Sequence, residues 1–490
     1  MNSYKSLFKY SLLCTPLFSA CAADESTKES TDSNRPNIIL FVTDDHGRDA
    51  LGCYGNSVVS TPNLDRLASE GVRFENAYCT SASSAASRSV LLTGQYGHAI
   101  GAYGHVHDYH HFSTYDTVRS LPVMLSQGGY YTARVGKYHV APETVYHFDK
   151  TYNANARNTV EMAEVSSEIF NSESPFFLYF CTDDPHRSGF TKSADDWRSP
   201  NRFGNRNEGY EGVETITFDY RDVVVPEFLP DNEETRREIA EYYQSIARVD
   251  QGFGRLMQHL EESGKADNTI VIYISDNGMA FPGAKTTTYE AGIKLPCIIK
   301  DPTLGDGSKG SLNHSMISWV DMTPTILDMA GVEVDTQFQG RSFRDVIASE
   351  DTENWDQIYA SHTFHEITMY YPMRVVRDGR YKLIWNAAYR LEYPFASDLY
   401  VSSTWQSVKR SGADKIGGRS VESYLFRPEF ELFDLESDPN EFENLSGREE
   451  YKETLDALLL KLKEWQKETK DPWYILWSGD TSMQGKGENL

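Results

Sequence analysis

The chain has 490 residues, enough for one large domain and a smaller one, and its composition is that of an ordinary globular protein. Its formal net charge of −25 argues against a general nucleic-acid-binding protein, which needs a basic face, so no nucleic-acid partner is expected. Any site for an anion must therefore be a local pocket of Lys, Arg and His that overcomes the negative field of the whole chain.

The first residues are typical of a targeting segment. Two lysines precede a short, mostly apolar run over 10–20, which is too short to span a bilayer. The run ends at Cys21 after two small residues, which resembles a bacterial lipoprotein signal; a plain secretory signal is the alternative. We predict a signal segment over 1–21 and a flexible polar tether over 22–34. We thus expect an exported protein, a periplasmic or outer-membrane-anchored lipoprotein of a Gram-negative bacterium, that meets the membrane only through its lipid anchor.

Apolar runs that look like strands buried on both faces alternate with amphipathic helices along the next 300 or so residues. One helix is predicted over 61–71, with a threonine cap, a proline in its first turn and a glycine at its end, and another over 239–260. This alternation predicts an α/β fold with a large, mostly parallel sheet sandwiched by helices. The predicted strands are Asn37 to Thr43, Tyr130 to Gly136, Pro175 to Thr182 and Asn268 to Ser275.

The pattern changes after about residue 350. Residues 371–386 and 431–445 read as short antiparallel strands with turns, and a last helix carries apolar residues on one face between Tyr451 and Trp465. We therefore predict a catalytic domain over 35–350 and a smaller C-terminal α+β subdomain over 351–490, built on an antiparallel sheet. The four cysteines beyond the signal are widely scattered, which fits isolated buried thiols better than two disulfides.

Each predicted strand runs into polar residues. In an open parallel sheet the carboxyl ends of the strands meet at one edge, where ligands bind. An aspartate after a single strand is usually a helix cap or a turn former, but four such ends together indicate one site. Carboxylate and amide oxygens without clustered cysteines favour Ca²⁺ or Mg²⁺ over Zn²⁺. The residues are Asp44 and Asp45, Lys137 and His139, Asp183, Asp184 and His186, and Asp276 and Asn277.

The stretch SASSAASRSVLLTG, over 81–94, supplies a candidate nucleophile. We expect its helix to begin near Ser87, which places Ser84 beside the helix N-terminus, where backbone N–H groups favour an anion. Arg88 follows one turn later. Together with the strand ends, this is the layout of a site for a tetrahedral oxyanion.

Residues 84–94 resemble the signature of the formylglycine-dependent sulfatases of the alkaline phosphatase superfamily, Cys/Ser-x-Pro/Ala-x-Arg followed by Leu-Thr-Gly. Ser84 falls at the nucleophile position, Ala86 replaces the commoner proline and Arg88 is retained. The resemblance implies an alkaline-phosphatase-like fold and a maturase that oxidises Ser84 to formylglycine. The hydrate of that aldehyde attacks sulfur, and the resulting hemiacetal eliminates sulfate. An unmodified serine would lack the second hydroxyl that drives this elimination.

The same resemblance implies roles for the residues at the strand ends. Arg88 would hold the formylglycine, His139 would act as the base and His186 would serve the leaving atom. The implied catalytic set is Ser84, Arg88, Lys137, His139, His186 and Lys285, with both lysines binding sulfate. The implied ligands of one Ca²⁺ per chain are Asp44, Asp45, Asp276, Asn277 and Ser84 as formylglycine.

Stretches outside the sulfate site, among them YGHVHDYHHF, DPHRSG and HEITMYYPMR, are similar to the sulfamidase branch of the family, the N-sulfoglucosamine sulfohydrolases. This implies an exo-acting enzyme that removes the N-sulfate from a non-reducing-end N-sulfoglucosamine of heparin or heparan sulfate oligosaccharides. A homodimer is left open. The candidate sugar contacts are His105, His107, His365, Glu366 and Arg374. The histidines over 105–111 fit a pocket-lining loop better than a zinc site.

Three other functions stay open on the sequence alone. The first is an O-sulfatase acting on another sulfated glycan. The second is a phosphatase or phosphodiesterase with unmodified Ser84, although such enzymes usually use two zinc ions and extra Asp/His ligands that do not follow Asp276. The third is a catalytically inactive glycan-binding lipoprotein. Whether Ser84 is native or stands for a cysteine is also left open.

Overall fold

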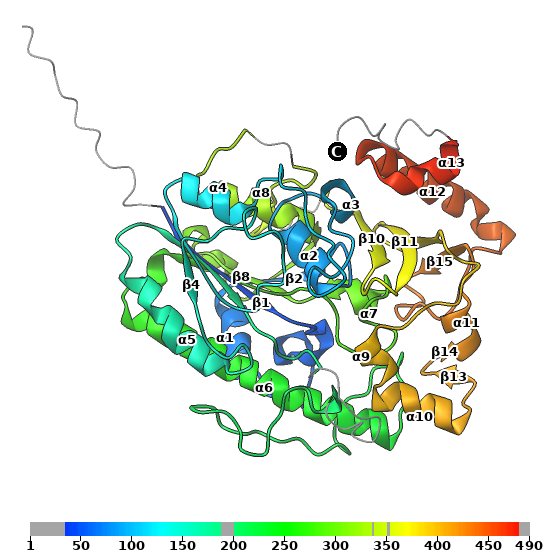
Figure 1. Cartoon of the computed structure of the whole chain (residues 1–490), viewed down its shortest axis with the longest axis horizontal. Helices are drawn as coiled ribbons and strands as arrows, with labels where there is room; N and C mark the ends of the chain where they lie inside the picture. The colour runs from blue at the N-terminus through cyan, green and yellow to red at the C-terminus, as the bar shows by residue number, and fades with distance from the viewer. Residues whose placement is uncertain (1–34, 188–199, 336–337, 350–352, 480–490) are drawn as a thin grey trace, which may run out of the picture.

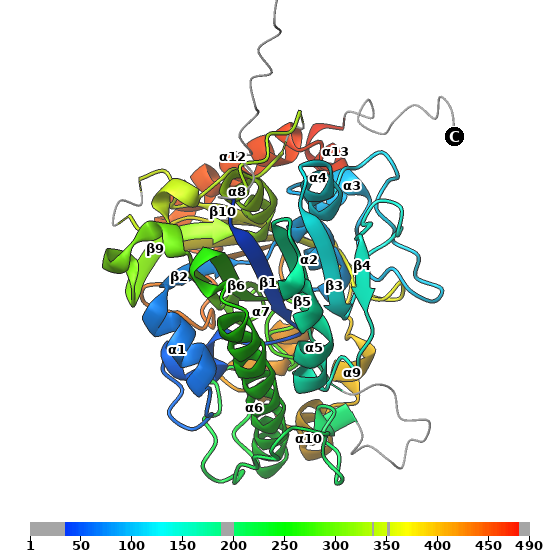
Figure 2. The ribbon, with the colours of Figure 1, turned by 90° about the vertical axis from the view of Figure 1, so that its left-hand side faces the viewer.

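The computed structural model describes residues 35–187, 200–335, 338–349 and 353–479. The strands of its larger sheet are β1 (Asn37–Thr43), β2 (Val72–Tyr78), β3 (Tyr131–Gly136), β4 (Lys150–Tyr152), β5 (Phe176–Cys181), β6 (Thr269–Ser275), β7 (Lys294–Leu295), β8 (Cys297–Lys300) and β9 (Ser311–Ser318). Their order is β4-β3-β5-β1-β6-β8-β2-β7, with β9 paired to β2. The pairs from β4 to β6 are all parallel, as Figure 2 shows, whereas β7 and β8 pair antiparallel with their neighbours. The prediction of a mostly parallel sheet is confirmed.

Helices cover both faces of this sheet (Figure 1). The residues of β1 are all buried, and they alternate between two cores because successive side chains of a strand point to opposite faces. Ile39 and Phe41 pack with α1, α5 and α6, while Ile38, Leu40 and Val42 share a core with α2, α4 and α8. The bounds are α1 (Pro62–Glu70), α2 (Ser84–Leu91), α4 (Leu121–Gln127), α5 (Thr159–Ser166), α6 (Glu233–Glu262) and α8 (Met322–Met329).

Helix α1 ends before Gly71 as predicted, but its cap differs from the prediction. The Thr61 side chain makes no capping hydrogen bond to the helix and accepts one from the backbone N–H of Gly52 instead. The carboxylate of Asp250, on α6, accepts from the backbone N–H groups of Asn63 and Leu64. A neighbouring helix therefore satisfies the open donors of this N-terminus, which local sequence alone does not reveal.

A second, antiparallel sheet lies in the C-terminal region, with the order β10-β11-β12-β15. Its strands are β10 (Ile358–Phe364), β11 (Tyr370–Arg377), β12 (Tyr381–Asn386) and β15 (Phe430–Asp434), and β13 (Lys415–Ile416) pairs with β14 (Arg419–Ser420). Leu458, Leu462 and Trp465 of α12 (Lys452–Glu468) join a core with Val376 and Leu383 of the sheet. The expected antiparallel sheet is thus present, while the domain boundary at 350 stays a prediction. The remaining helices are α3 (Gly97–Ile100), α7 (Glu290–Ile293), α9 (Ser397–Tyr400), α10 (Ser403–Ser411), α11 (Val421–Leu425) and α13 (Ile475–Ser478).

The expected isolated thiols are confirmed, because Cys53, Cys79, Cys181 and Cys297 are all free. The predicted signal and tether lie outside the described residues, so export and lipid anchoring stay predictions. Across the described part of the chain, no helix is long and apolar enough to cross a membrane.

Candidate active site

Three carboxylates converge where β1 and β6 end. Asp44, Asp45 and Asp276 are fully buried, and each offers an oxygen within 4.8 Å of the others. Asp45 has a φ of 64°, and its backbone N–H donates to Asp276 Oδ1 at 3.1 Å. Asn277 adds its side-chain amide, whose Nδ2 donates to Asp45 Oδ1 at 2.6 Å. We call Asp44, Asp45, Asp276 and Asn277 the cation floor.

The chemistry of the cation floor fits a hard divalent cation. Burial, followed by the charge of Asp44, raises the pKa of Asp276 to about 7, so both the apolar surroundings and a neighbouring carboxylate act against its ionised form. Burial also acts to raise the pKa of Asp44, but Lys137 and the cations around it hold that pKa well below its usual value. Oxygen-only donor sets of this kind suit Mg²⁺ or Ca²⁺. The residues predicted as ligands are therefore brought together.

Ser84 lies directly against this floor. Its Oγ donates to Asp44 Oδ1 at 2.8 Å, and Asn277 Oδ1 lies 3.3 Å away. Helix α2 begins at Ser84 itself and not near Ser87, because Ser83 is the extended N-cap residue and its carbonyl accepts from Ser87 N–H at 2.9 Å. The small side chains over 84–87 let this whole first turn be buried.

Arg88 anchors the helix to the floor. Its Nε donates to Asp276 Oδ2 at 2.9 Å, and both side chains are fully buried. The two terminal nitrogens of its guanidinium are buried and have no hydrogen-bond partner among the described residues. Buried polar groups are normally satisfied, so two such donors, one helical turn after Ser84, are suited to an anionic or carbonyl oxygen supplied by a bound or modified group.

Two lysines bring positive charge to the floor. Lys137 donates to Asp44. The Nζ of Lys285 lies 3.0 Å from Asp45 Oδ2, 2.9 Å from Asp398 Oδ2 and 2.9 Å from His186 Nε2. Burial alone would lower the pKa of Lys285, but Asp398 and Asp45 raise it, so Lys285 is an ammonium. Burial and then Lys285 lower the pKa of His186, so the imidazole is neutral and Nε2 accepts from Lys285.

A cavity of about 690 Å³ opens above these lysines, and we call it the histidine cavity. Burial is the main reason that the pKa of His105 falls to about 2 and that of His139 falls well below its usual range, so both are uncharged. Both ring nitrogens of His139 are buried without a hydrogen-bond partner in the described structure. The predicted site residues in its lining are His105, His107, Lys137, His139, His186, Lys285, His365 and Glu366.

One wall of the histidine cavity comes from the C-terminal region. We call His365, Glu366, Ser397 and Asp398 the C-terminal wall. His365 Nδ1 lies 2.9 Å from Ser83 Oγ, next to the candidate nucleophile. Glu366 accepts from the backbone N–H of Ser397 at 2.9 Å. Sequence reasoning missed Asp398, which lies on the four-residue helix α9 with no motif around it to mark it.

Two predictions need correction. Arg374, expected to reach the sugar, is not in the lining of the cavity; its fully buried guanidinium binds both carboxylate oxygens of Asp471 at 2.6 and 2.9 Å. Asp184 does lie at the polar edge, where its carbonyl accepts from the Asp44 N–H at 3.2 Å, but its carboxylate forms a buried structural pair with Arg157 at 2.7 Å and Arg248 at 2.6 Å and does not join the site. Both side chains meet a partner of opposite charge far away in the sequence.

Known proteins resemble this chain in sequence and in fold. A family model described as Sulfatase matches residues 36–332, and one described as N-sulphoglucosamine sulphohydrolase, C-terminal, matches 284–395. The chain is 35% identical to human N-sulphoglucosamine sulphohydrolase over 89% of this chain and 91% of that one. It is 27% identical to an N-acetylglucosamine-6-O-sulfatase of Bacteroides thetaiotaomicron, covering 94% and 91%. A protein solved with its substrate D-glucosamine-2-N,6-O-disulfate superposes with a TM-score of 0.65, at 24% identity over 89% of this chain and 99% of that one.

Proposed function

The chain belongs to the sulfatase family and is a hydrolase of sulfate esters or sulfamides, and from this premise we propose that it removes the N-sulfate from a non-reducing-end N-sulfoglucosamine of heparin or heparan sulfate oligosaccharides. One observation carries the choice of substrate. The model of the N-sulphoglucosamine sulphohydrolase C-terminal region spans 284–395, and this stretch contains Lys285, His365 and Glu366 of the cavity lining. The matched range therefore reaches the lining of the cavity and is not confined to the scaffold.

We propose that a maturase converts Ser84 to formylglycine and that the cation floor holds one Ca²⁺. Formylglycine supplies a hydrated aldehyde as the nucleophile. The cation, when bound, supplies positive charge to the sulfate oxygens. Arg88 keeps α2 against the floor through Asp276, and its two terminal nitrogens, which have no hydrogen-bond partner in the described structure, are the donors that we assign to the modified side chain. Lys137 and Lys285 bind the outer oxygens of the sulfate group.

His186 is the proposed proton donor to the departing nitrogen. Its Nδ1 is bonded to the carbonyl of Arg187, which fixes the ring so that Nε2 points to Lys285. When the N–S bond breaks, the nitrogen leaves as an amine and needs a proton; we propose that the bound sulfamate anion favours the protonated form of His186, so that its Nε2–H supplies that proton. His139 also lines the cavity, and neither of its ring nitrogens has a hydrogen-bond partner in the described structure, so one of them can take a proton from the nucleophile.

The position of Lys285 argues against the phosphatase alternative. Asp45, His186 and Asp398 offer three ligand atoms within 4.8 Å of one another, which is where a second metal ion would bind. The ammonium of Lys285 lies within 3.0 Å of all three residues. A fixed cation of the chain therefore fills the place that two-metal hydrolysis needs.

The experiment has two steps. The protein is first produced with and without a maturase that accepts serine, and mass spectrometry of the Ser84 peptide tests for an aldehyde in place of the alcohol. The matured enzyme is then given N-sulfated and 6-O-sulfated glucosamine side by side. We expect N-desulfation that depends on the maturase. Preferential removal of the 6-O-sulfate would overturn the substrate, and equal turnover without the maturase would support the unmodified-serine reading.

A further inference from the structure

Asp398 is a carboxylate in a cavity whose charged floor is arranged to receive an anion. Its Oδ2 lies 2.9 Å from Lys285 Nζ and 3.9 Å from His186 Nε2, and 17% of its side chain is exposed. Asp45 contacts the same ammonium at 3.0 Å, but it is fully buried and belongs to the cation floor. Asp398 is thus the carboxylate next to Lys285 that also reaches the histidine cavity.

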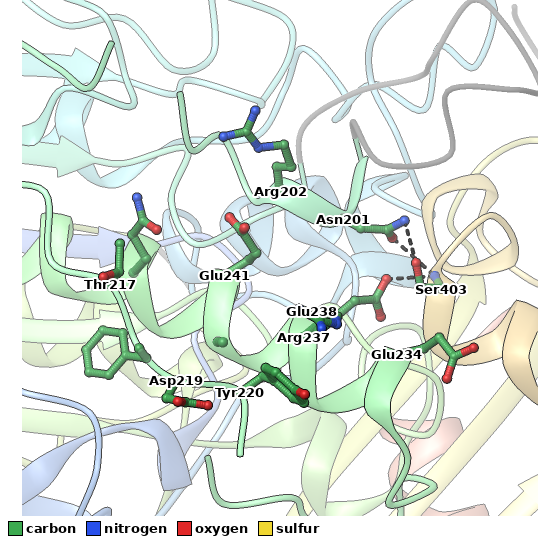
Figure 3. Close-up of a pocket in the computed structure, with 13 residues that line it drawn as sticks. Asn201, Arg202, Thr217, Asp219, Tyr220, Glu234, Arg237, Glu238, Glu241 and Ser403 are labelled. Carbon is green, nitrogen blue, oxygen red and sulfur yellow. Dashed lines mark hydrogen bonds between the residues drawn. The ribbon is translucent and has the colours of Figure 1, made fainter. Parts of the chain in front are cut away.

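A buried carboxylate fixes the segment that carries Asp398. Glu238, on α6, accepts from Ser403 N–H at 2.7 Å and from Thr404 Oγ1 at 2.6 Å, at the start of α10. It also pairs with Arg187, the residue after His186, at 2.9 Å. Figure 3 shows Glu238 beside Asn201 and Ser403, in a separate cavity along α6. The loop with His186 and the segment with Asp398 are therefore held by one group, which fixes their separation.

The chemistry of Asp398 restricts what it can bind. A sulfate and an ionised carboxylate both accept hydrogen bonds and both carry negative charge, so Asp398 cannot bind the outer sulfate oxygens directly. It needs a donor, and a sugar supplies hydroxyl groups. In a non-reducing-end N-sulfoglucosamine, C1 is committed to the glycosidic bond, so the free hydroxyl nearest to the sulfamate nitrogen is the one on C3. If His186 serves that nitrogen, as proposed above, Asp398, 3.9 Å from His186 Nε2, is close enough to meet a substituent on the next carbon.

We propose that Asp398 is a specificity-determining residue that accepts a hydrogen bond from the free 3-hydroxyl of the terminal sugar and excludes a 3-O-sulfate. The proposal rests on the proposed N-sulfatase function. A 3-O-sulfate would remove the donor and place a second anion against a fixed, mostly buried carboxylate. Sites built to bond a hydroxyl reject analogues without that donor by large factors. We therefore expect kcat/KM for the N,3-O-disulfated sugar to be lower by at least about 100-fold.

The test compares three methyl glycosides of glucosamine as probes: the N-sulfate, the N,3-O-disulfate and the N,6-O-disulfate. The matured wild-type enzyme should discriminate against the 3-O-sulfate but treat the 6-O-sulfate within about tenfold of the parent. Asp398→Asn keeps an oxygen for Lys285 but removes the charge, so it should reduce the discrimination at least about tenfold. Asp116→Asn is the matched control, because Asp116 is an exposed aspartate outside the lining of the cavity, and it should leave the ratio unchanged.

Equal wild-type turnover of the N-sulfate and the N,3-O-disulfate would overturn the proposal without any variant. So would a folded Asp398→Asn enzyme that keeps the wild-type ratio, and Asp398→Ser serves as the second variant if the first does not fold. Failure of the proposed function would give a different result, because the wild-type enzyme would then release N-sulfate from none of the three probes. That result would also overturn the proposal for Asp398, which rests on the N-sulfatase function.

Discussion

The cation floor and the C-terminal wall face the same cavity but are built in different ways. The floor follows directly from β1 and β6, two paired strands at the centre of the large sheet. The wall comes from a segment after β10 and from the short helix α9, which are held by side-chain hydrogen bonds such as that from Ser397 to Glu366. The charged floor thus rests on the regular scaffold, and the C-terminal wall rests on irregular segments, where side chains can vary without disturbing the fold.

The largest expected effect is on the floor. Ser84→Ala should lower N-desulfation by at least about 10⁴-fold, because the group that becomes the nucleophile is gone. The fold should persist, since the hydroxyl makes its hydrogen bonds to Asp44 and Asn277 alone. The measurement is turnover of N-sulfoglucosamine by wild type and variant, both produced together with the maturase, and a thermal melt of each. The matched control is Ser83→Ala, whose hydroxyl faces His365 in the wall; a loss as large as that of Ser84→Ala would contradict the division between floor and wall.

The second prediction concerns the cation. Asp276→Asn removes a floor carboxylate and the partner of Arg88, so it should abolish Ca²⁺ binding and lower turnover by at least about 10³-fold. Calorimetric titration of Ca²⁺ into unmatured protein gives a readout apart from activity. Wild-type enzyme stripped with a chelator should regain activity with Ca²⁺ and not with Zn²⁺. Full activity of thoroughly stripped enzyme would show that the floor needs no metal.

The third prediction separates stability from recognition in the C-terminal region. Arg374→Met leaves Asp471 buried without its partner, which should cost about 3–5 kcal/mol of unfolding free energy. KM should stay unchanged, because Arg374 does not line the cavity. Chemical denaturation and substrate saturation measure the two effects, and Arg390→Met, on the surface, is the control with little expected change in either. A raised KM at unchanged stability would instead support a direct contact between Arg374 and the sugar.

The fourth prediction concerns pH. Burial lowers the pKa of His98 to about 4, where the ring lies beside Thr469 of the C-terminal region. The unfolded chain takes up a proton as the pH falls below about 6.5, but the folded ring does not do so until about 4. This term should therefore remove roughly 3 kcal/mol of stability between those two pH values. Urea unfolding from pH 7 to pH 4 measures it, and His98→Asn should flatten the profile where His111→Asn, an exposed control, should not.

Much of the scaffold and of the floor could be predicted from the sequence. Apolar runs identified β1, β5 and β6, and the rule that parallel strands bring their ends to one edge brought Asp44 and Asp276 together. The predicted start of α2, near Ser87, was three residues too late. The first turn begins at Ser84 because it is buried, and the small side chains of this turn permit that burial without revealing it in the sequence.

The wall was less predictable. Arg374 lies only nine residues after His365 in the sequence, yet its position is decided by Asp471, 97 residues further on. The position of Asp398 depends on its contact with Lys285 and on Glu238, which binds the segment that follows α9. Contacts at such separations have no period or motif, so a single sequence gives no signal for them.

The backbone of the floor continues the hydrogen bonds of the sheet, and this has a consequence for hydrogen exchange. The amide of Asp44 donates to the carbonyl of Asp184 at 3.2 Å, and that of Asp276 donates to the carbonyl of Thr43 at 3.0 Å. Amides in such central positions exchange only when the whole domain opens, whereas those of short surface helices such as α9 exchange through local opening. The backbone of the cation floor should therefore persist as long as the native state itself, while α9 of the C-terminal wall opens and closes many times within that lifetime.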